Sequence, residues 1–520
     1  VFVRHEIALV VLCPEFQAGQ LAVYHGPHTA PAQRQTLGPP VREGKVVIEH
    51  MNGIHYPLPD DNFNPDKCYP EYPFGSKEIS TKPNNAYELV RNCLADMGLD
   101  EKHHGTEQWN PLGAYIKPGD FVVIKPNLVM HVNENKHASE NAFECLITNP
   151  ACIRAICDYC IIALNGSGRL MIGDAPMQGC DFDALLKKSS LPKVIDFYKG
   201  QGITVELKDF RQYQSKFNAN KVIVDKKYND TQGIVVHMGA KSRHMGSNSN
   251  GIYQVSDYDK ADTAAFHHDA VHDYEINRDI LQADVVINLC KPKTHRLAGI
   301  TAAMKNMVGI TYNKACLPHR SAGSVEERGD AYQHKCFLKR VADDALTRKI
   351  RAENAGKYGY ATILRYVYGV SLVLARKFGK DTYYIGSWYG NDTIWRTICD
   401  LNYIVRYADK DGVLHTDPQR QMLNFGDMII AGERNGPVSP SPKMLGAVIA
   451  SEDPAAFDVT LCKLMGFPFE KIPLARNLIT GKTIILYTTP EVIINGTNSV
   501  SLDNIKFPEE WKFEPHDAWK

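Results

Sequence analysis

The stretch FVVIKPN at residues 121–127, with TNPACIRAICDYCIIALN at 148–165 and RLMIGDAP at 169–176, decides the fold that the sequence predicts. The first and third pieces are short apolar runs that end in polar residues, as buried strands do. The middle piece predicts a helix that Thr148 or Asn149 caps. A strand, a helix and a second strand in this order predict parallel strands joined by a right-handed crossover.

The same alternation continues along the chain. A helix is predicted over 182–200 and a strand over 203–207. Further on, ADVVINL at 283–289 predicts a central strand, followed by a helix over 393–408 and a strand over 444–449. We therefore expect an α/β fold with a mostly parallel sheet, flanking helices and insertions.

The alternation of strands and helices is interrupted twice, and the interruptions divide the chain into four segments. Polar runs and a group of histidines interrupt it once, and a charge-rich helical pattern interrupts it again. The predicted segments are an N-terminal strand and turn-rich part at 1–110, an α/β core at 111–312 with an insertion at about 210–280, a helical insertion at 313–385, and a second α/β unit with a C-terminal tail at 386–520.

Composition excludes several classes of protein. The 520 residues contain 59 basic and 59 acidic side chains, so the chain lacks the overall positive charge of a nucleic-acid-binding protein. Charged residues make up 23% and apolar residues 44%, which is typical of a globular protein and not of a disordered one. The 13 cysteines are scattered, which favours free thiols in a reducing compartment, and we expect a cytoplasmic protein.

Two apolar runs are candidates for membrane segments. The run at 7–13 is short and ends at Pro14, so it predicts a buried strand. The longer run at 361–378 contains Arg365 and other basic residues and predicts an amphipathic helix rather than a membrane span. The first residue is Val1 and not methionine, so the sequence leaves open whether a leader peptide has been removed.

Polar side chains follow three of the predicted strands. Lys125 and Asn127 end the first, Asp174 ends the second, and Lys293 and His295 follow the third. Ligands of parallel sheets bind at the carboxyl ends of the strands, so we expect these side chains to face one cleft. The alternative is that the loops are polar merely because they are exposed.

The segment KPKTHRLAGITAAMKNMVG at 291–309 contains the most side chains that could bind a ligand or take part in catalysis. Lys291, Lys293 and Lys305 alternate with small residues, a composition that suits a carboxylate or phosphate ligand. A lysine with a lowered pKa could act as a base or nucleophile, and His295 as a general acid or base. A basic surface loop that leads into an amphipathic helix would have the same composition.

Acidic and histidine side chains suggest cation sites. Asp174 or Glu433 could orient a partner or hold a cation, or could simply pair with the lysines. In HHDAVHD at 267–273, His268 and His272 are four residues apart, so on a helix they would share a face and could bind a transition metal. A solvated, exposed face is the alternative reading of this motif.

Several of these motifs together resemble the family known as domain of unknown function 362 (DUF362). They are VIKPN at 123–127, TNP at 148–150, Gly173-Asp174, ADVVINLCKPKTH at 283–295, KNMVG at 305–309 and GNDTIW at 390–395. The chain looks like a longer subgroup that has no attached ferredoxin domain. The resemblance implies no generally established activity. Many relatives carry cysteine-rich ferredoxin-like domains, but this chain lacks those cysteine runs, so an iron–sulfur cluster is not expected.

These observations lead to two hypotheses. The first is an enzyme that binds a small anionic or sugar-derived substrate and performs proton-transfer or redox chemistry. Its expected catalytic residues are Lys293, His295, Lys305 and Asp174, and its expected substrate-binding residues are Lys125, Asn127, Lys291, Asn306 and Glu433. The second is a noncatalytic module that binds a glycan, a metal or a partner, or that assembles. The sequence leaves open whether the protein binds a divalent metal and whether it forms a homo-oligomer. We expect neither nucleic-acid binding nor a membrane span.

Overall fold

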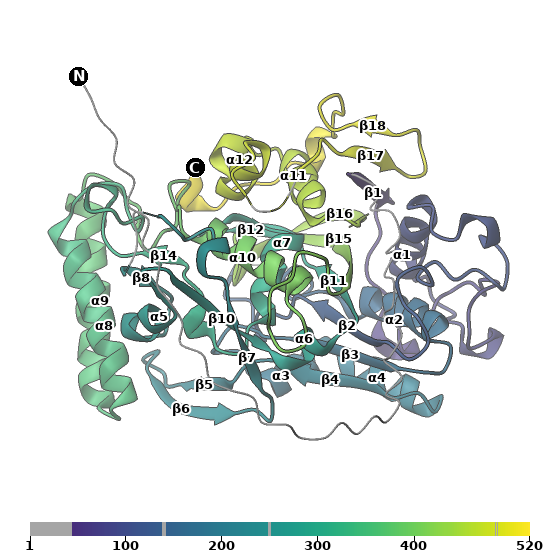
Figure 1. The fold of residues 1–520 in the computed structure, drawn as a ribbon, viewed down its shortest axis with the longest axis horizontal. Helices are drawn as coiled ribbons and strands as arrows, with labels where there is room; N and C mark the ends of the chain where they lie inside the picture. The colour runs from purple at the N-terminus through teal and green to yellow at the C-terminus, as the bar shows by residue number, and fades with distance from the viewer. Residues whose placement is uncertain (1–43, 138–141, 248–250, 484, 486) are drawn as a thin grey trace, which may run out of the picture. The chain divides into compact units, whose positions relative to one another are not determined.

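A computed structural model describes residues 44–520, apart from 138–141, 248–250, 484 and 486 (Figure 1). The described residues all belong to one compact unit, Gly38–Lys520. The strand predicted at 7–13 lies outside the described residues.

One large sheet organises the Gly38–Lys520 unit. Its strands lie in the order β18-β17-β1-β16-β15-β11-β2-β3-β4, with β12 and β13 attached beside β15. The pairs from β15 to β4 are all parallel, whereas β16 is antiparallel to both of its neighbours. The predicted α/β fold with a mostly parallel sheet is therefore confirmed. The strands are β1 (Lys45–His50), β2 (Phe121–Pro126), β3 (Arg169–Asp174), β4 (Val205–Asp209), β11 (Val285–Cys290), β12 (Lys293–His295), β13 (Gly299–Thr301), β15 (Gln421–Asn435), β16 (Ser439–Ser451), β17 (Glu491–Ile494) and β18 (Val500–Ser501).

Helices cover both faces of this sheet, because successive side chains of a buried strand point in opposite directions. Val122 and Ile124 of β2 pack with side chains of α1, α2 and α4, whereas Val123 packs on the other face with α6 and α10. A third apolar cluster joins α7, α11 and α12 to β1 and β16. These helices are α1 (Asn85–Asp96), α2 (Pro150–Leu164), α3 (Phe182–Ser189), α4 (Leu191–Gly200), α6 (Arg278–Gln282), α7 (Ala303–Asn306), α10 (Ile394–Tyr407), α11 (Pro454–Leu464) and α12 (Pro473–Ile479).

Local sequence explains where these helices begin and end. The side chain of Asn149 accepts a hydrogen bond from the backbone N–H of Ala151 and caps α2. The single helix predicted over 182–200 is wrong: Ser190 adopts a left-handed φ of 60° and separates α3 from α4.

The two insertions differ in structure. The first holds β5 (Tyr213–Phe217), β6 (Ile223–Tyr228), β7 (Gly233–His237), β8 (Tyr253–Gln254), α5 (Lys260–Phe266), β9 (His267–His268) and β10 (Val271–Asn277). The second becomes helical only at α8 (Phe337–Asn354) and α9 (Tyr358–Phe378), which lie side by side (Figure 1). Before α8, the short strand β14 (Arg320–Ser321) pairs with β8 of the first insertion. The two insertions are therefore connected to each other as well as to the sheet.

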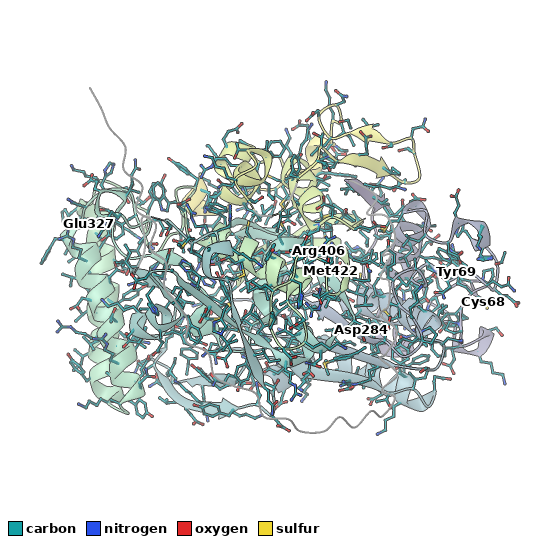
Figure 2. The ribbon with its side chains drawn as sticks, in the orientation of Figure 1. Cys68, Tyr69, Asp284, Glu327, Arg406 and Met422 are labelled. Atoms are coloured by element: carbon teal, nitrogen blue, oxygen red, sulfur yellow. The ribbon has the colours of Figure 1, made fainter. Side chains whose placement is uncertain are left out.

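Asp284, labelled in Figure 2, directly precedes β11 and bonds to Phe121, the first residue of β2. Its backbone N–H donates to the carbonyl of Phe121, and its carboxylate accepts from the N–H of Phe121, both at 2.9 Å. The two strands are parallel and both begin at the edge of the sheet where Asp284 lies, so their carboxyl ends share the opposite edge of the sheet. Among the described helices, none has the length and apolar content that crossing a bilayer requires.

Candidate functional site

The carboxyl ends of β11, β2 and β3 lie next to one another, because these strands are adjacent and parallel. A cavity of about 150 Å³ lies at this edge of the sheet. It is lined by six of the residues that the sequence singles out: Asn127, Asp174, Lys293, His295, Lys305 and Asn306. Loops that follow three neighbouring strands thus contribute side chains to the same small cavity.

A buried ion pair joins the first two strand ends. Lys125 Nζ lies 2.7 Å from Asp174 Oδ1, and both side chains are buried. Lys125 also donates to the carbonyl of Pro126 and to Asn306 Oδ1, at 2.7 and 3.1 Å. An ammonium group has three protons, so these partners leave none for a ligand. Lys125 therefore positions Asp174 and Asn306 and does not itself line the cavity.

The glycine of the KNMVG motif is required by this ion pair. A Cβ atom on Gly309 would lie 2.1 Å from Asp174 Oδ1 and 2.6 Å from Lys125 Nζ. Both distances are far below a van der Waals contact, so any larger residue would displace the pair. The KNMVG motif therefore places at Gly309 a residue small enough to leave room for the Lys125–Asp174 pair.

A chain of amide side chains connects Lys293 to the centre of the sheet. Lys293 Nζ donates to Asn127 Oδ1 at 2.7 Å and to the carbonyl of Leu146. Asn127 donates to Asn306 Oδ1 at 3.0 Å, and Asn306 donates to Asn288 Oδ1 at 2.8 Å. Because these partners of Lys293 are uncharged, burial lowers the pKa of its amine to about 7.

Lys291 has a different environment from the other lysines of its segment. Its Nζ lies 3.0 Å from Asp427 Oδ2 and donates to the hydroxyl of Tyr56 at 2.6 Å. The same carboxylate accepts hydrogen bonds from the hydroxyl of Tyr56 and from the backbone N–H of Asn149. Lys291 is not among the cavity-lining residues, so its position fits a buried structural pair better than substrate binding.

The ring of His295 has a defined tautomer. Its Nδ1 accepts hydrogen bonds from the backbone N–H groups of Leu297 and Ala298, at 3.0 and 3.1 Å. Burial and the nearby Lys305 and Arg296 hold the pKa of His295 well below its usual value, so the ring is neutral. In a neutral ring whose Nδ1 accepts, Nε2 carries the proton. His295 is therefore a hydrogen-bond donor at the cavity.

His319 has the opposite tautomer and was missed by the sequence analysis. Its Nδ1 lies 2.8 Å from the carbonyl of Leu317 and must donate to it, so Nε2 carries a lone pair. Burial lowers the pKa of His319 to about 3, which keeps the ring neutral. His319 lines the same cavity as His295. The two rings thus offer one donor and one acceptor to a ligand.

Lys314 was also missed, because residues 313–385 were assigned to a helical insertion. It lines the cavity, and its Nζ donates to the carbonyl of Ala175 at 2.7 Å. Burial lowers the pKa of Lys314 to about 8. The signal that could have found Lys314 and His319 is their position, within 14 residues after Lys305 and before any helical pattern.

Two cations of the cavity, Lys305 and Arg296, have no described side-chain hydrogen bond or ion pair. Among the described residues, no hydrogen-bond acceptor or carboxylate contacts the Nζ of Lys305, although the residue is 8% exposed. Burial, together with Lys314 and Lys125, lowers its pKa to about 7. The cavity is lined by four basic side chains, Lys293, Arg296, Lys305 and Lys314, against two carboxylates, Asp174 and Asp257. Asp174 is already paired with Lys125, so the described lining has an excess of positive charge.

Glu433 lies away from this cavity. It belongs to β15, and its carboxylate accepts a hydrogen bond from the backbone N–H of Glu514 at 3.0 Å. Glu433 is not among the residues that line the cavity. The contact that the structure gives it is with the C-terminal part of the chain, not with the lysines.

A shared metal-binding face of His268 and His272 would require a helix, and the structure has none at this motif. Residues 267–273 form a β-hairpin of β9 and β10, in which Asp269 has a left-handed φ of 47°. His268 is exposed, whereas His272 is buried next to His267, with 3.4 Å between the two Nδ1 atoms. His268 and His272 therefore do not share a face. Over the part of the chain that the structure describes, no group of three or more His, Cys, Asp or Glu side chains could hold a metal ion.

Fold and cavity together define an α/β protein with a cation-rich site at the carboxyl edge of a parallel sheet. Residues 222–463 match the model of the family described as domain of unknown function (DUF362). The matched region includes β11, both histidines of the cavity and three of its lysines, whereas Asn127 and Asp174 precede it. No curated protein and no solved structure matches the chain.

Proposed function

We propose that the protein is an enzyme that binds a small anionic substrate in this cavity and transfers a proton to or from it. The observation that carries the proposal is the excess of buried cations at the cavity, because no described acceptor satisfies the amine of Lys305 or the guanidinium of Arg296. Burying a charged group without a partner is costly, and a bound anion would remove that cost. The substrate's carboxylate or phosphate group would supply the missing acceptor.

The cavity side chains divide into two kinds of role. Arg296 and Lys314 would hold the anion, because a guanidinium stays charged when buried and Lys314 retains two free protons. Lys305 would exchange the proton, since a pKa of about 7 lets the amine act in both protonation states near neutral pH. His295 Nε2–H and His319 Nε2 would orient the substrate as donor and acceptor.

The volume limits the substrate. A cavity of about 150 Å³ admits a molecule of a few heavy atoms, and is smaller than the pockets of roughly 300–1,000 Å³ that hold drug-sized ligands. A short carboxylic acid, a phosphate ester or a sugar-derived acid fits this description. A polymeric glycan would have to present only its end.

Calorimetry with malonate and with inorganic phosphate tests the anion site. We expect Lys305→Met to weaken binding of the preferred anion at least about tenfold, because an ionic partner of the ligand is lost. Lys410→Met is the matched control: Lys410 pairs with Asp284 at the opposite edge of the sheet. Equal effects of the two variants, or the absence of binding of either anion, would contradict the proposal.

Catalysis needs a separate readout. Native mass spectrometry of the protein purified from its source would identify a retained small molecule, and proton NMR in D₂O would follow exchange of its carbon-bound protons. Exchange that is lost in Lys305→Met and kept in Lys410→Met would support the enzyme. Tight binding without any exchange or turnover would favour the noncatalytic module instead.

A further inference from the structure

Helix α9 carries a continuous stripe of exposed apolar side chains. Ile363, Tyr366, Val370, Val373, Leu374 and Phe378 are between 38% and 69% exposed. Apart from the adjacent pair Val373 and Leu374, they are spaced by three and four residues, so they lie on one face of the helix over most of its length. Part of this face, around Val370 and Val373, forms a shallow groove in the surface. Isolated exposed apolar residues are common, but a continuous stripe is typical of a surface that binds a protein, a membrane or a ligand.

The stripe is not the face that attaches α9 to the protein. Ala361, Leu364, Ser371 and Ala375 lie on the opposite side and are buried. Ala361 and Leu364 pack with Ala352 of α8, and α8 and α9 stand side by side (Figure 1). The helix is therefore apolar on two faces, and only one of them is needed for folding.

The charges of α9 identify its partner. The helix contains Arg365, Arg376 and Lys377 but no aspartate or glutamate. A second copy of the chain that packed its own α9 on this face would bring like charges together. An anionic bilayer provides both an apolar interior and a negatively charged surface.

We propose that α9 lies in the plane of an anionic membrane surface, with its exposed apolar stripe inserted among the lipids and its basic residues at the headgroups. This inference is independent of the function proposed for the cavity. A helix of 21 residues is about 30 Å long, and amphipathic helices of this kind bind in the interface without crossing it. Tyr366 and Phe378 supply the aromatic rings that favour the interfacial region.

Co-sedimentation with lipid vesicles tests this proposal on the full chain. We expect the protein to bind vesicles of phosphatidylcholine mixed with phosphatidylserine, and to bind phosphatidylcholine alone much more weakly. Val373→Glu should reduce binding to the mixed vesicles by about tenfold or more, because it places a carboxylate in the apolar stripe and near anionic lipid. Val413→Glu is the matched control: Val413 is 57% exposed but lies outside α9.

The double variant Arg376→Gln/Lys377→Gln tests the electrostatic part. It should lower the difference between mixed and neutral vesicles, and added salt should do the same to the unmodified protein. Circular dichroism would verify that each variant is folded. Failure to bind mixed vesicles, or an equal loss with Val413→Glu, would overturn the proposal. A dimer in analytical ultracentrifugation that Val373→Glu dissociates, without vesicle binding, would assign the stripe to a second copy.

Discussion

At the cavity, hydrogen bonds to the backbone decide what each histidine can do. His295 receives two backbone N–H groups at Nδ1, and His319 gives its Nδ1 proton to a carbonyl. Neutral histidines of opposite tautomer can hold a substrate by two different atoms without adding charge. The positive charge of the site then comes from the lysines and Arg296 alone.

The lysines make anion binding depend on pH. Burial lowers the pKa of Lys293 and Lys305 to about 7 and that of Lys314 to about 8. Each amine is charged only below its pKa, so the cavity gains positive charge as the pH falls. We expect calorimetry to show that malonate affinity decreases as the pH rises from about 6 to about 9.

Proton uptake provides the control for that prediction. A bound anion stabilises the ammonium form, so binding near pH 7 should take up protons, and the measured enthalpy should depend on the ionisation enthalpy of the buffer. Affinity that is constant over this range, with no proton uptake, would show that these lysines do not contact the anion.

The helices and strands that were predicted well have a clear period of apolar residues and, for helix α2, a capping residue. The helix over 150–164 and the strands near 121, 169 and 283 are α2, β2, β3 and β11. At 267–273, the spacing of four between histidines would give a shared face only on a helix, and the same spacing also occurs across the tight turn that the structure forms. Only the left-handed backbone at Asp269 distinguishes the two, and an aspartate does not by itself require it.

Which of two candidate residues caps α2 was decided by the structure. The side chain of Asn149 accepts from the first turn of the helix, whereas the hydroxyl of Thr148 donates to the carbonyl of Leu289 in β11. Thr148 therefore joins the start of α2 to the neighbouring strand.

Removal of the α2 cap should destabilise the protein. We expect Asn149→Ala to lower the free energy of unfolding by about 1 kcal/mol, because one backbone N–H of the first turn loses its acceptor. Asn149→Asp keeps an acceptor and should have a much smaller effect. Urea denaturation followed by circular dichroism measures both. Equal losses would show that the amide nitrogen, and not the cap oxygen, is responsible.

In the whole Gly38–Lys520 unit, segments from both ends of the sequence complete the sheet and support the site. β1 lies between β16 and β17, so strands more than 400 residues apart are neighbours. Near the C-terminus, Trp519 Nε1 donates to the carbonyl of Arg296 at 2.7 Å. The ring of Trp519 also lies against Gly299, which pairs with His295 across β12 and β13.

This contact predicts that the C-terminal tryptophan affects both stability and binding. Trp519→Ala should lower the free energy of unfolding by about 3–5 kcal/mol, as truncation of a buried tryptophan does, and should also weaken malonate binding. Trp511→Ala is the control: Trp511 is also buried but packs on His50 and Phe507. Urea denaturation and calorimetry measure the two effects. Weakened binding in both variants would mean that Trp519 acts only through overall stability.

The sequence by itself determined the α/β class, the main strands and helices, and the segment at 291–309 that supplies much of the cavity. These depend on local apolar periods, caps and strand-end polarity, which are visible within a few residues. Only the tertiary structure decided which lysines are available to a ligand. Lys125 and Lys291 are paired with Asp174 and Asp427, whereas Lys305 has no described partner. The physical reason is that carboxylates distant in sequence neutralise a buried cation only once the fold has brought them together.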